Sequence, residues 1–150
     1  MANSSVWGPP IWKLFHVLLE KIKEESFSKL YLQLFQLIKR ICNHLPCPEC
    51  SNHATIFLSK VRIEQISCKN DFKNMLYLFH NKVNLRRSKS LFPYAEMQKY
   101  KNQNLITIYN NFITVYNTKG NMNLLIDSFQ RQLVLKEFKK WITTNLIHFQ

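Results

Sequence analysis

The sequence predicts an all-α fold, and three features of the 150-residue chain lead to this expectation. Apolar residues recur mostly at intervals of three and four, whereas the alternation typical of half-buried strands is weak. Glycine is scarce, with two residues, and all five prolines lie in the first two thirds of the chain. Hydrophobic residues make up 46% of the chain, which is enough for the core of one domain.

The first helix is expected to begin at Pro9-Pro10, because proline suits a first helical turn, where no backbone donor is needed. One face of this helix carries Trp12, Phe15, His16 and Leu19. A second helix should run from about Ser28 to Leu45 and end at Pro46, since a residue before proline disfavours helical conformation. Its apolar stripe is formed by Leu30, Leu34, Leu37, Ile38 and Ile41.

A third helix is expected to start at the Cys47-Pro48-Glu49-Cys50 segment, with Cys47 near the cap. Ser67 to Asn70 should form a loop, and Asp71 should open a fourth helix that ends in Arg86-Arg87-Ser88-Lys89. The apolar positions of that fourth helix are Phe72, Met75, Leu76, Phe79 and Val83. Pro93 should break the chain before a short helix from Tyr94 to Tyr100.

The residue composition of the chain changes beyond about residue 102. The runs 106–109 and 113–116 are rich in β-branched residues and are compatible with short strands or with a helix. Gly120-Asn121 is a turn signal, and Met122 to Phe149 should form a final amphipathic helix. The apolar residues assigned to that helix are Leu125, Phe129, Leu133, Phe138 and Trp141.

Composition excludes several function classes. Gly8 and Gly120 stand alone, so neither a dinucleotide-binding fingerprint nor a phosphate-binding glycine loop is present. The formal net charge is +12, but the basic residues are spread along the chain, which favours a solvated basic surface over a specific nucleic-acid partner. Neither a signal peptide nor an apolar run of about 18 residues is present, so we expect a protein made inside a cell, with no membrane partner.

The Cys-x-x-Cys pair, Cys47 and Cys50, carries the clearest chemical signal. At a helix start, unpaired backbone N–H groups and the positive end of the helix dipole stabilise a thiolate. Two cysteines at this spacing can close a reducible disulfide and pass electrons onward. The same motif is also half a zinc site, so a zinc-stabilised, basic binding module without catalysis is the alternative. Its ligands would be drawn from Cys42, Cys47, Cys50, Cys68, His44 and His53.

A second cluster is polar. His80, Asn81 and Asn84 gather near one face of an otherwise apolar helix, and buried polar groups need partners. A planar heterocycle edged with donors and acceptors would be such a partner, with Trp12 and Phe79 as apolar walls. Taken singly, His16 and His80 are expected to be core histidines, and Trp7 and Trp12 to be core filling.

Together these clusters resemble the Erv/ALR family of FAD-linked sulfhydryl oxidases. Its three motifs occur in order between about residues 6 and 100, with the compact version of nucleocytoplasmic large DNA viruses as the nearest pattern. The matching residues are Trp7-Gly8, Trp12 and His16; then Cys47, Cys50 and His53; then His80-Asn81-Lys82-Val83-Asn84 and Lys89.

The resemblance implies a four-helix bundle with a short fifth helix, FAD in the mouth of the bundle, and a homodimer. It implies an FAD-binding sulfhydryl oxidase domain over 1–102. The remaining 103–150 is an extension that we expect to be helical and packed on the same domain.

The resemblance also assigns roles. Cys50 would lie against the flavin C4a atom, and Cys47 would be the outer sulfur that the substrate thiol attacks. The cofactor-binding set would be Gly8, Trp12, His16, Cys50, His53, His80, Asn81, Val83, Asn84 and Lys89, with no metal ligand. Trp12 and His80 are the local candidates for holding the adenine, and Arg86 would join Lys89 near the phosphates.

The chain departs from the family pattern at several points. Arg87 replaces a frequent leucine, Phe92 or Tyr94 stands where many members have a tryptophan, and no second Cys-x-x-Cys pair exists. Without such a shuttle, the substrate should be a protein dithiol met directly, such as a thioredoxin-like or Cys-x-x-Cys carrier, with O2 as electron acceptor. The expected location is the host cytoplasm or a viral assembly site, with packaging in the virion.

Overall fold

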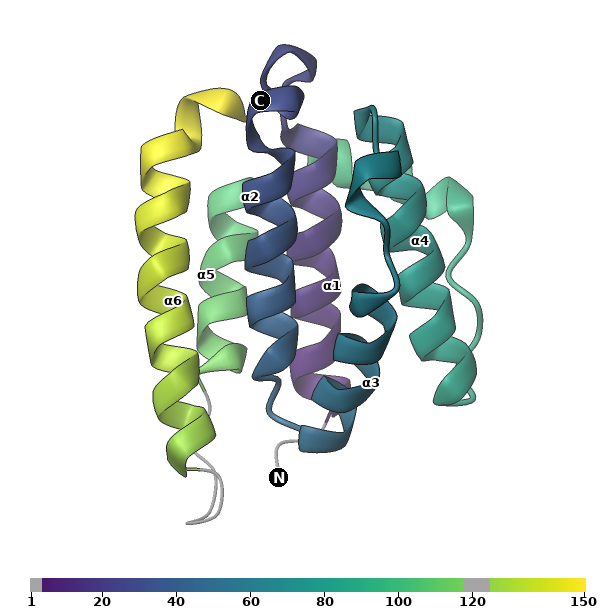
Figure 1. Cartoon of the computed structure of the whole chain (residues 1–150), viewed down its shortest axis with the longest axis vertical. Helices are drawn as coiled ribbons and strands as arrows, with labels where there is room; N and C mark the ends of the chain where they lie inside the picture. The colour runs from purple at the N-terminus through teal and green to yellow at the C-terminus, as the bar shows by residue number, and fades with distance from the viewer. Residues whose placement is uncertain (1–3, 118–124) are drawn as a thin grey trace.

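The computed structural model describes residues 4–117 and 125–150, and these are mostly helical (Figure 1). The elements, with η marking 3-10 helix, are α1 (Ser4–Lys21), α2 (Glu24–Asn43), α3 (Pro48–Ser59), η1 (Ile63–Gln65), α4 (Lys69–Arg86), η2 (Tyr94–Asn102), α5 (Leu105–Tyr116), α6 (Leu125–Asn145) and η4 (Leu146–His148). Over these ranges the β-type pairing is limited to an isolated bridge between Ile22 and Phe149. The all-α prediction is confirmed.

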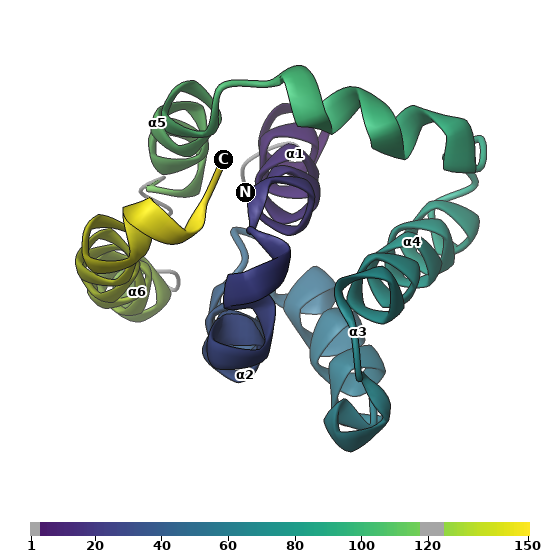
Figure 2. The ribbon, with the colours of Figure 1, turned by 90° about the horizontal axis from the view of Figure 1, so that it is seen from above.

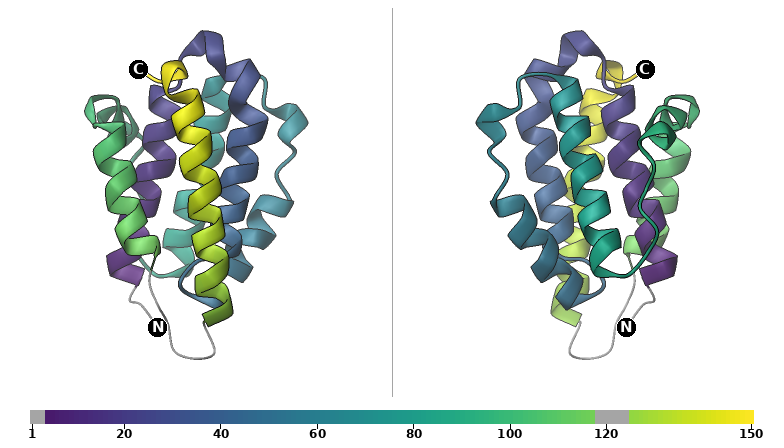
Figure 3. Two further views of the ribbon diagram at one scale, coloured as in Figure 1. Left: turned by 90° about the vertical axis from the view of Figure 1, so that its left-hand side faces the viewer. Right: turned by 90° about the vertical axis from the view of Figure 1, so that its right-hand side faces the viewer.

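The helices are arranged around a central pair, α1 and α2. Seen from above, α3 and α4 lie on one side of this pair, and α5 and α6 lie on the other (Figure 2). The two side views show α6 in front from one direction and α4 in front from the other (Figure 3). The structure therefore has an α3–α4 side and an α5–α6 side that share α1 and α2.

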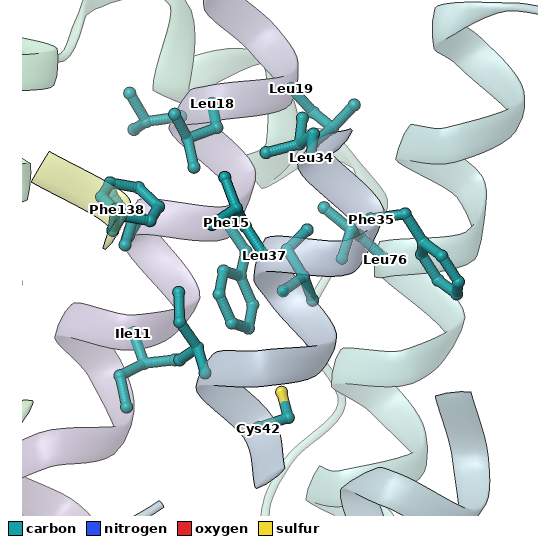
Figure 4. Packing of buried hydrophobic residues seen from close by; sticks show 14 of the residues in the cluster. Ile11, Phe15, Leu18, Leu19, Leu34, Phe35, Leu37, Cys42, Leu76 and Phe138 are labelled. Atoms are coloured by element: carbon teal, nitrogen blue, oxygen red, sulfur yellow. The ribbon is translucent and has the colours of Figure 1, made fainter. Parts of the chain in front are cut away.

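The central position of α1 follows from its sequence, because residues 14–20 are all buried. A helix that is apolar on every side needs neighbours on every side. Figure 4 shows Leu18 of α1 on the side of Phe138 from α6, and Leu19 on the side of Leu34 from α2. Leu76 of α4 lies on the opposite side of this core from Phe138. One hydrophobic core thus joins both sides of the molecule, while a domain division at residue 102 stays a prediction.

Several helix boundaries differ from those expected. The start of α1 at Ser4 places Pro9 and Pro10 inside the helix, so the expected start at Pro9 was wrong. Each proline lacks a backbone N–H and so leaves one carbonyl of the preceding turn without its helical donor. The second helix begins at Glu24, ahead of Ser28, because two glutamates in its first turn favour the positive end of the dipole.

The 106–116 region resolves as helix α5. Its buried residues recur at intervals of three and four, which is the helical period: Leu105, Ile108, Tyr109, Phe112 and Tyr116. This face packs on α1, and burial outweighs the β preference of the intervening branched residues. Asn104 caps the helix, with its side-chain Oδ1 accepting from Thr107 N at 2.9 Å. The turn expected at Gly120-Asn121 lies outside the described residues, as does the expected start at Met122.

Helix α6 faces the core with a register different from the expected one. Val134, Phe138 and Ile142 are buried, whereas Phe129 and Leu133 are 58% and 42% exposed. The expected stripe was therefore wrong at Phe129 and Leu133, because Phe138 sets the rotation of the helix and those two residues lie off its face.

Polar contacts fix the helices to one another at both ends. Tyr116 Oη donates to the Ile41 carbonyl at 2.9 Å, which ties α5 to α2. Lys73 pairs with the buried Glu20 at 2.6 Å, and Lys69 Nζ donates to the carbonyls of Glu20 and Ile22, which ties α4 to α1. The buried Glu20 carboxylate is thus paired with Lys73, and the buried Lys69 ammonium is hydrogen-bonded to two carbonyls, as a low-dielectric interior requires.

The C-terminus of α4 forms a Schellman motif. Lys89 N donates to Asn84 O at 2.8 Å, and Ser88 N donates to Leu85 O at 3.2 Å. Ser88 occupies the left-handed position of this motif with φ of 56°. A side chain in that conformation costs about 1 kcal/mol, which glycine avoids.

We expect Ser88→Gly to raise the free energy of unfolding by about 0.5–1 kcal/mol, because glycine relieves the left-handed strain and loses part of the gain to chain entropy. Chemical denaturation of the purified proteins under identical conditions measures this. Ser90→Gly is the matched control, since Ser90 does not adopt positive φ, and it should be neutral or destabilising. Equal effects of the two substitutions would contradict the strain argument.

Candidate active site

The dithiol lies at the start of α3, as predicted. Cys47 is the N-cap residue, and its Sγ accepts a hydrogen bond from Cys50 N at 3.3 Å. The turn that leads into the helix is held by Ser51, whose Oγ accepts from Leu45 N at 2.8 Å. Pro48 occupies the first turn, where its missing donor costs nothing. The local sequence thus places both sulfurs at the positive end of a helix.

The two cysteines differ in exposure. Cys50 is 8% exposed, and Cys47 is partly exposed. Burial, together with the neighbouring Cys47, raises the pKa of the Cys50 thiol to about 11. Hydrogen bonding from Arg86 and the charge of Arg87 act in the opposite direction on that pKa. Cys50 is therefore the enclosed sulfur and Cys47 the approachable one.

Cys50 faces a cavity of about 320 Å³ enclosed by α1, α3, α4 and the segment after α4. Eight of the ten residues expected to bind the cofactor line it: Gly8, Trp12, Cys50, His53, His80, Val83, Asn84 and Lys89. Trp7 and Phe79 also line it, as does Phe92, the expected substitute for the missing tryptophan, while Tyr94 does not. A Cβ built on Gly8 would meet no atom within 4 Å, so this glycine leaves open space.

His16 and Asn81 are the two expected residues that the structure does not place in the lining. His16 is buried and stacks on Trp12, and its Nε2 lies 3.0 Å from His80 Nδ1. Burial and the neighbouring His80 lower the pKa of His16 to about 3. Burial and the charge of Lys89 lower the pKa of His80 to about 4. Both rings are therefore neutral at pH 7, and one N–H forms the hydrogen bond between them.

Asn81 and Asn84 anchor the segment after α4. Asn81 makes two hydrogen bonds with the backbone of Phe92, accepting from its N at 2.6 Å and donating to its O at 3.2 Å. Asn84 Nδ2 donates to Ser90 O at 3.2 Å. These amides satisfy the backbone of the segment that brings Phe92 to the cavity.

Aromatic rings form one wall of the cavity. Trp12 and His80 lie face to face, with ring centroids 4.2 Å apart and an angle of 7° between the planes. Phe92 stacks on His80 at 4.6 Å, and Phe79 meets Trp12 edge-on at 4.9 Å. Since 4.2 Å leaves no room for a third ring, a purine would stack beside the Trp12–His80 pair rather than within it.

The lining carries positive charge and, within the described chain, no carboxylate. Its cations are Lys13, Arg86, Arg87 and Lys89. Cys42 and Tyr100 also line the cavity, and the sequence patterns did not identify these two residues or Lys13. Cys42 ends a helix that is remote in sequence, and Tyr100 comes from η2, so both positions depend on tertiary packing. No local spacing signal could have found them.

A second cavity, of about 590 Å³, lies between α3 and α4 and shares part of the first cavity's wall. The shared residues are His53, Phe79, Val83 and Arg86. Lys60 and Lys82 add two more cations here. Two adjoining hollows with aromatic walls and a basic rim suit a ligand that combines flat rings with phosphates.

The zinc alternative requires several ligand side chains gathered at one place. Among residues 4–117 and 125–150, no three His, Cys, Asp or Glu side chains are grouped so as to hold a metal ion. Cys42 is buried at the end of α2, and Cys68 is exposed at the start of α4. In the same described part of the chain, no helix has the length and apolarity needed to cross a membrane.

Comparison with known proteins matches the Erv1/Alr family model to residues 9–105. Three curated relatives are named FAD-linked sulfhydryl oxidase and come from pig, warthog and tick isolates of African swine fever virus. Each is 27% identical over 100 residues, which cover 67% of this chain and 83% of the relative. No solved structure matches the chain significantly.

Proposed function

Because this chain belongs to the Erv1/Alr family, we propose that Cys47 and Cys50 are the redox-active pair of its cofactor site. The protein is an FAD-dependent thiol oxidase, in line with its named relatives. The observation that supports the assignment of the pair is that Cys50 lines the cavity, whereas Cys47 lies outside that lining and is more exposed. Cys50 then faces the cofactor, and Cys47 faces the substrate.

The residues present fit FAD. Trp12, Phe79 and His80 supply flat apolar walls for rings, and the open space at Gly8 adds room. Lys13, Arg86 and Lys89 supply positive charge for a pyrophosphate, with no carboxylate among the described lining residues. When bound, FAD takes two electrons from the reduced pair and passes them to O2, which gives hydrogen peroxide.

The chain's own step is thiol–disulfide exchange. A substrate thiolate attacks Cys47 in the closed Cys47–Cys50 disulfide, the S–S bond breaks, and Cys50 leaves as a thiolate. A second substrate thiolate attacks the mixed disulfide, which releases oxidised substrate and frees Cys47. Two electrons have then moved from the substrate dithiol to the pair. The exposure of Cys47 permits the first attack, and the burial of Cys50 keeps substrate from the inner sulfur.

Substrate, assembly and location follow as finer proposals. The protein oxidises protein dithiols, and we infer a thioredoxin-like or Cys-x-x-Cys carrier, because the chain has no second Cys-x-x-Cys pair to act as a shuttle. A homodimer is proposed from the family resemblance. The viral origin of the relatives supports a host cytoplasm or viral assembly site, with packaging in the virion.

The purified protein tests the function directly. We expect a yellow protein with one FAD per chain that consumes O2 and releases an equal amount of peroxide when given dithiothreitol or a reduced thioredoxin-like protein. Omitting the dithiol is the control, and O2 uptake should stop. A colourless protein with bound metal and reduced thiols would instead support the zinc-stabilised binding module.

A further inference from the structure

Arg87 occupies an unusual place for a residue at the end of a helix. It is the C-cap of α4, yet its guanidinium reaches across to the dithiol. Its Nη1 donates to Cys50 Sγ at 3.7 Å, and its Nη2 hydrogen-bonds to Ser4 Oγ at the start of α1. A charged guanidinium therefore lies beside the inner sulfur.

The charges around Cys50 come from three elements. Cys47, Glu49 and His53 belong to the N-terminus of α3, and Glu49 lies 3.6 Å from Arg86 and 3.7 Å from His53. Arg86 and Arg87 approach from α4, and their effect on the pKa of Cys50 is to lower it against burial. Lys13 of α1 and Lys89 line the same cavity. Arg87 Nη1 donates to the sulfur at 3.7 Å, and hydrogen bonding from Arg86 acts on the same thiol.

We propose that Arg87 stabilises the Cys50 thiolate that leaves when a substrate thiolate opens the Cys47–Cys50 disulfide. This inference rests on the proposed function of the pair. In the step, the S–S bond breaks, a bond forms between the substrate sulfur and Cys47, and the electron pair of the broken bond stays on Cys50. A nearby guanidinium lowers the energy of that anion, and a leaving group of lower pKa departs faster. Arg87 thereby offsets the burial that would otherwise slow release of the inner sulfur.

The contact between Arg87 and Cys50 allows an electrostatic role of Arg87 to be distinguished from a purely structural one. If Arg87 only fixed α4 to α1 through Ser4, a neutral polar side chain would change stability but not the acidity of Cys50. If its charge acts on the sulfur, Arg87→Gln and Arg87→Leu should both shift the pH profile of Cys50, and Arg87→Lys should largely preserve it.

The test measures alkylation of Cys50 by iodoacetamide in the FAD-bound protein, in a Cys47→Ser background, from pH 7 to 9.5 with peptide mass spectrometry. Removing a cation beside the buried Cys50 thiol should raise the pKa of that thiol by about one unit, so its alkylation at a given pH below that pKa should slow about tenfold. Arg87→Leu and Arg87→Gln should both show this, and Arg87→Lys should stay within about threefold of the parent. Lys139→Leu, on the exposed face of α6, is the control for lost net charge and should leave the profile unmoved.

The possible outcomes distinguish failure of the proposed role of Arg87 from failure of the proposed oxidase function. An unmoved profile in both neutral variants, or an equal shift in Lys139→Leu, overturns the role of Arg87 even while the wild-type protein still oxidises dithiols. A wild-type protein without FAD-dependent oxidation overturns the proposed function, and the inference falls with it. Arg87→Gln keeps the test decisive if the leucine variant loses FAD or fails to fold.

Discussion

Replacing Cys50 with serine should abolish turnover while FAD stays bound. Serine keeps the size of the side chain in a wall where Cys50 is 8% exposed, but its oxygen cannot form the disulfide. Loss of the residue that takes part in bond making should lower the rate by more than about a thousandfold. O2 uptake with dithiothreitol measures the rate, and the visible absorbance of the purified variant measures flavin content.

Cys68→Ser is the matched control for this result. Cys68 is exposed at the start of α4 and does not line the cavity, so its replacement should leave both turnover and flavin content unchanged. The assignment of Cys50 fails if Cys50→Ser keeps turnover, or if it folds normally yet no longer holds flavin.

Replacing Trp12 with alanine should weaken FAD binding about a hundredfold. The ring stacks on His80 at 4.2 Å, meets Phe79 at 4.9 Å and forms part of the cavity wall. Losing its contact with a flat ligand costs about 2–3 kcal/mol of binding free energy, which corresponds to about 30- to 150-fold in affinity. Fluorescence titration of the flavin-stripped protein with FAD measures this change.

Trp141→Ala separates this effect from general loss of stability. Trp141 is also partly buried and packs on Phe138 and Phe149, but it lies on α6 and does not line the cavity. Its replacement should lower thermal stability with FAD affinity preserved. The role of Trp12 is wrong if Trp12→Ala binds FAD within about threefold of wild type, or if both variants weaken binding equally.

The sequence allowed the helix of the dithiol to be predicted, because the information there is local. A Cys-x-x-Cys with proline in the first turn defines a helix start, and Cys47 is the N-cap in the structure. Helix α5 was left ambiguous, although Leu105, Ile108, Phe112 and Tyr116 follow the helical period. Branched residues between them carried the opposite preference, and the contact with α1 that decides the outcome is not local.

In the site, too, residues in local motifs could be predicted, whereas contacts between distant segments could not. Motif residues such as Trp12, His80 and Lys89 reached the cavity wall because their helices converge there. The reach of Arg87 to Cys50 could not be predicted, since it joins residues 37 positions apart through a side chain. Asn81 was expected to face a heterocycle, whereas in the structure it bonds to the backbone of Phe92, and only the path of that segment reveals this contact.

The enclosure of α1 has a consequence for how the chain responds to its cofactor. One face of α1 lines the cavity, and α5 packs against another face of the same helix. A ligand that binds only the folded form shifts the equilibrium of every element that melts together with its site. Flavin loading should therefore protect amide hydrogens of α5 from exchange, although α5 contributes no residue to the cavity lining. The stability of α5 and the binding of the cofactor are therefore thermodynamically linked through helix α1, which contacts both.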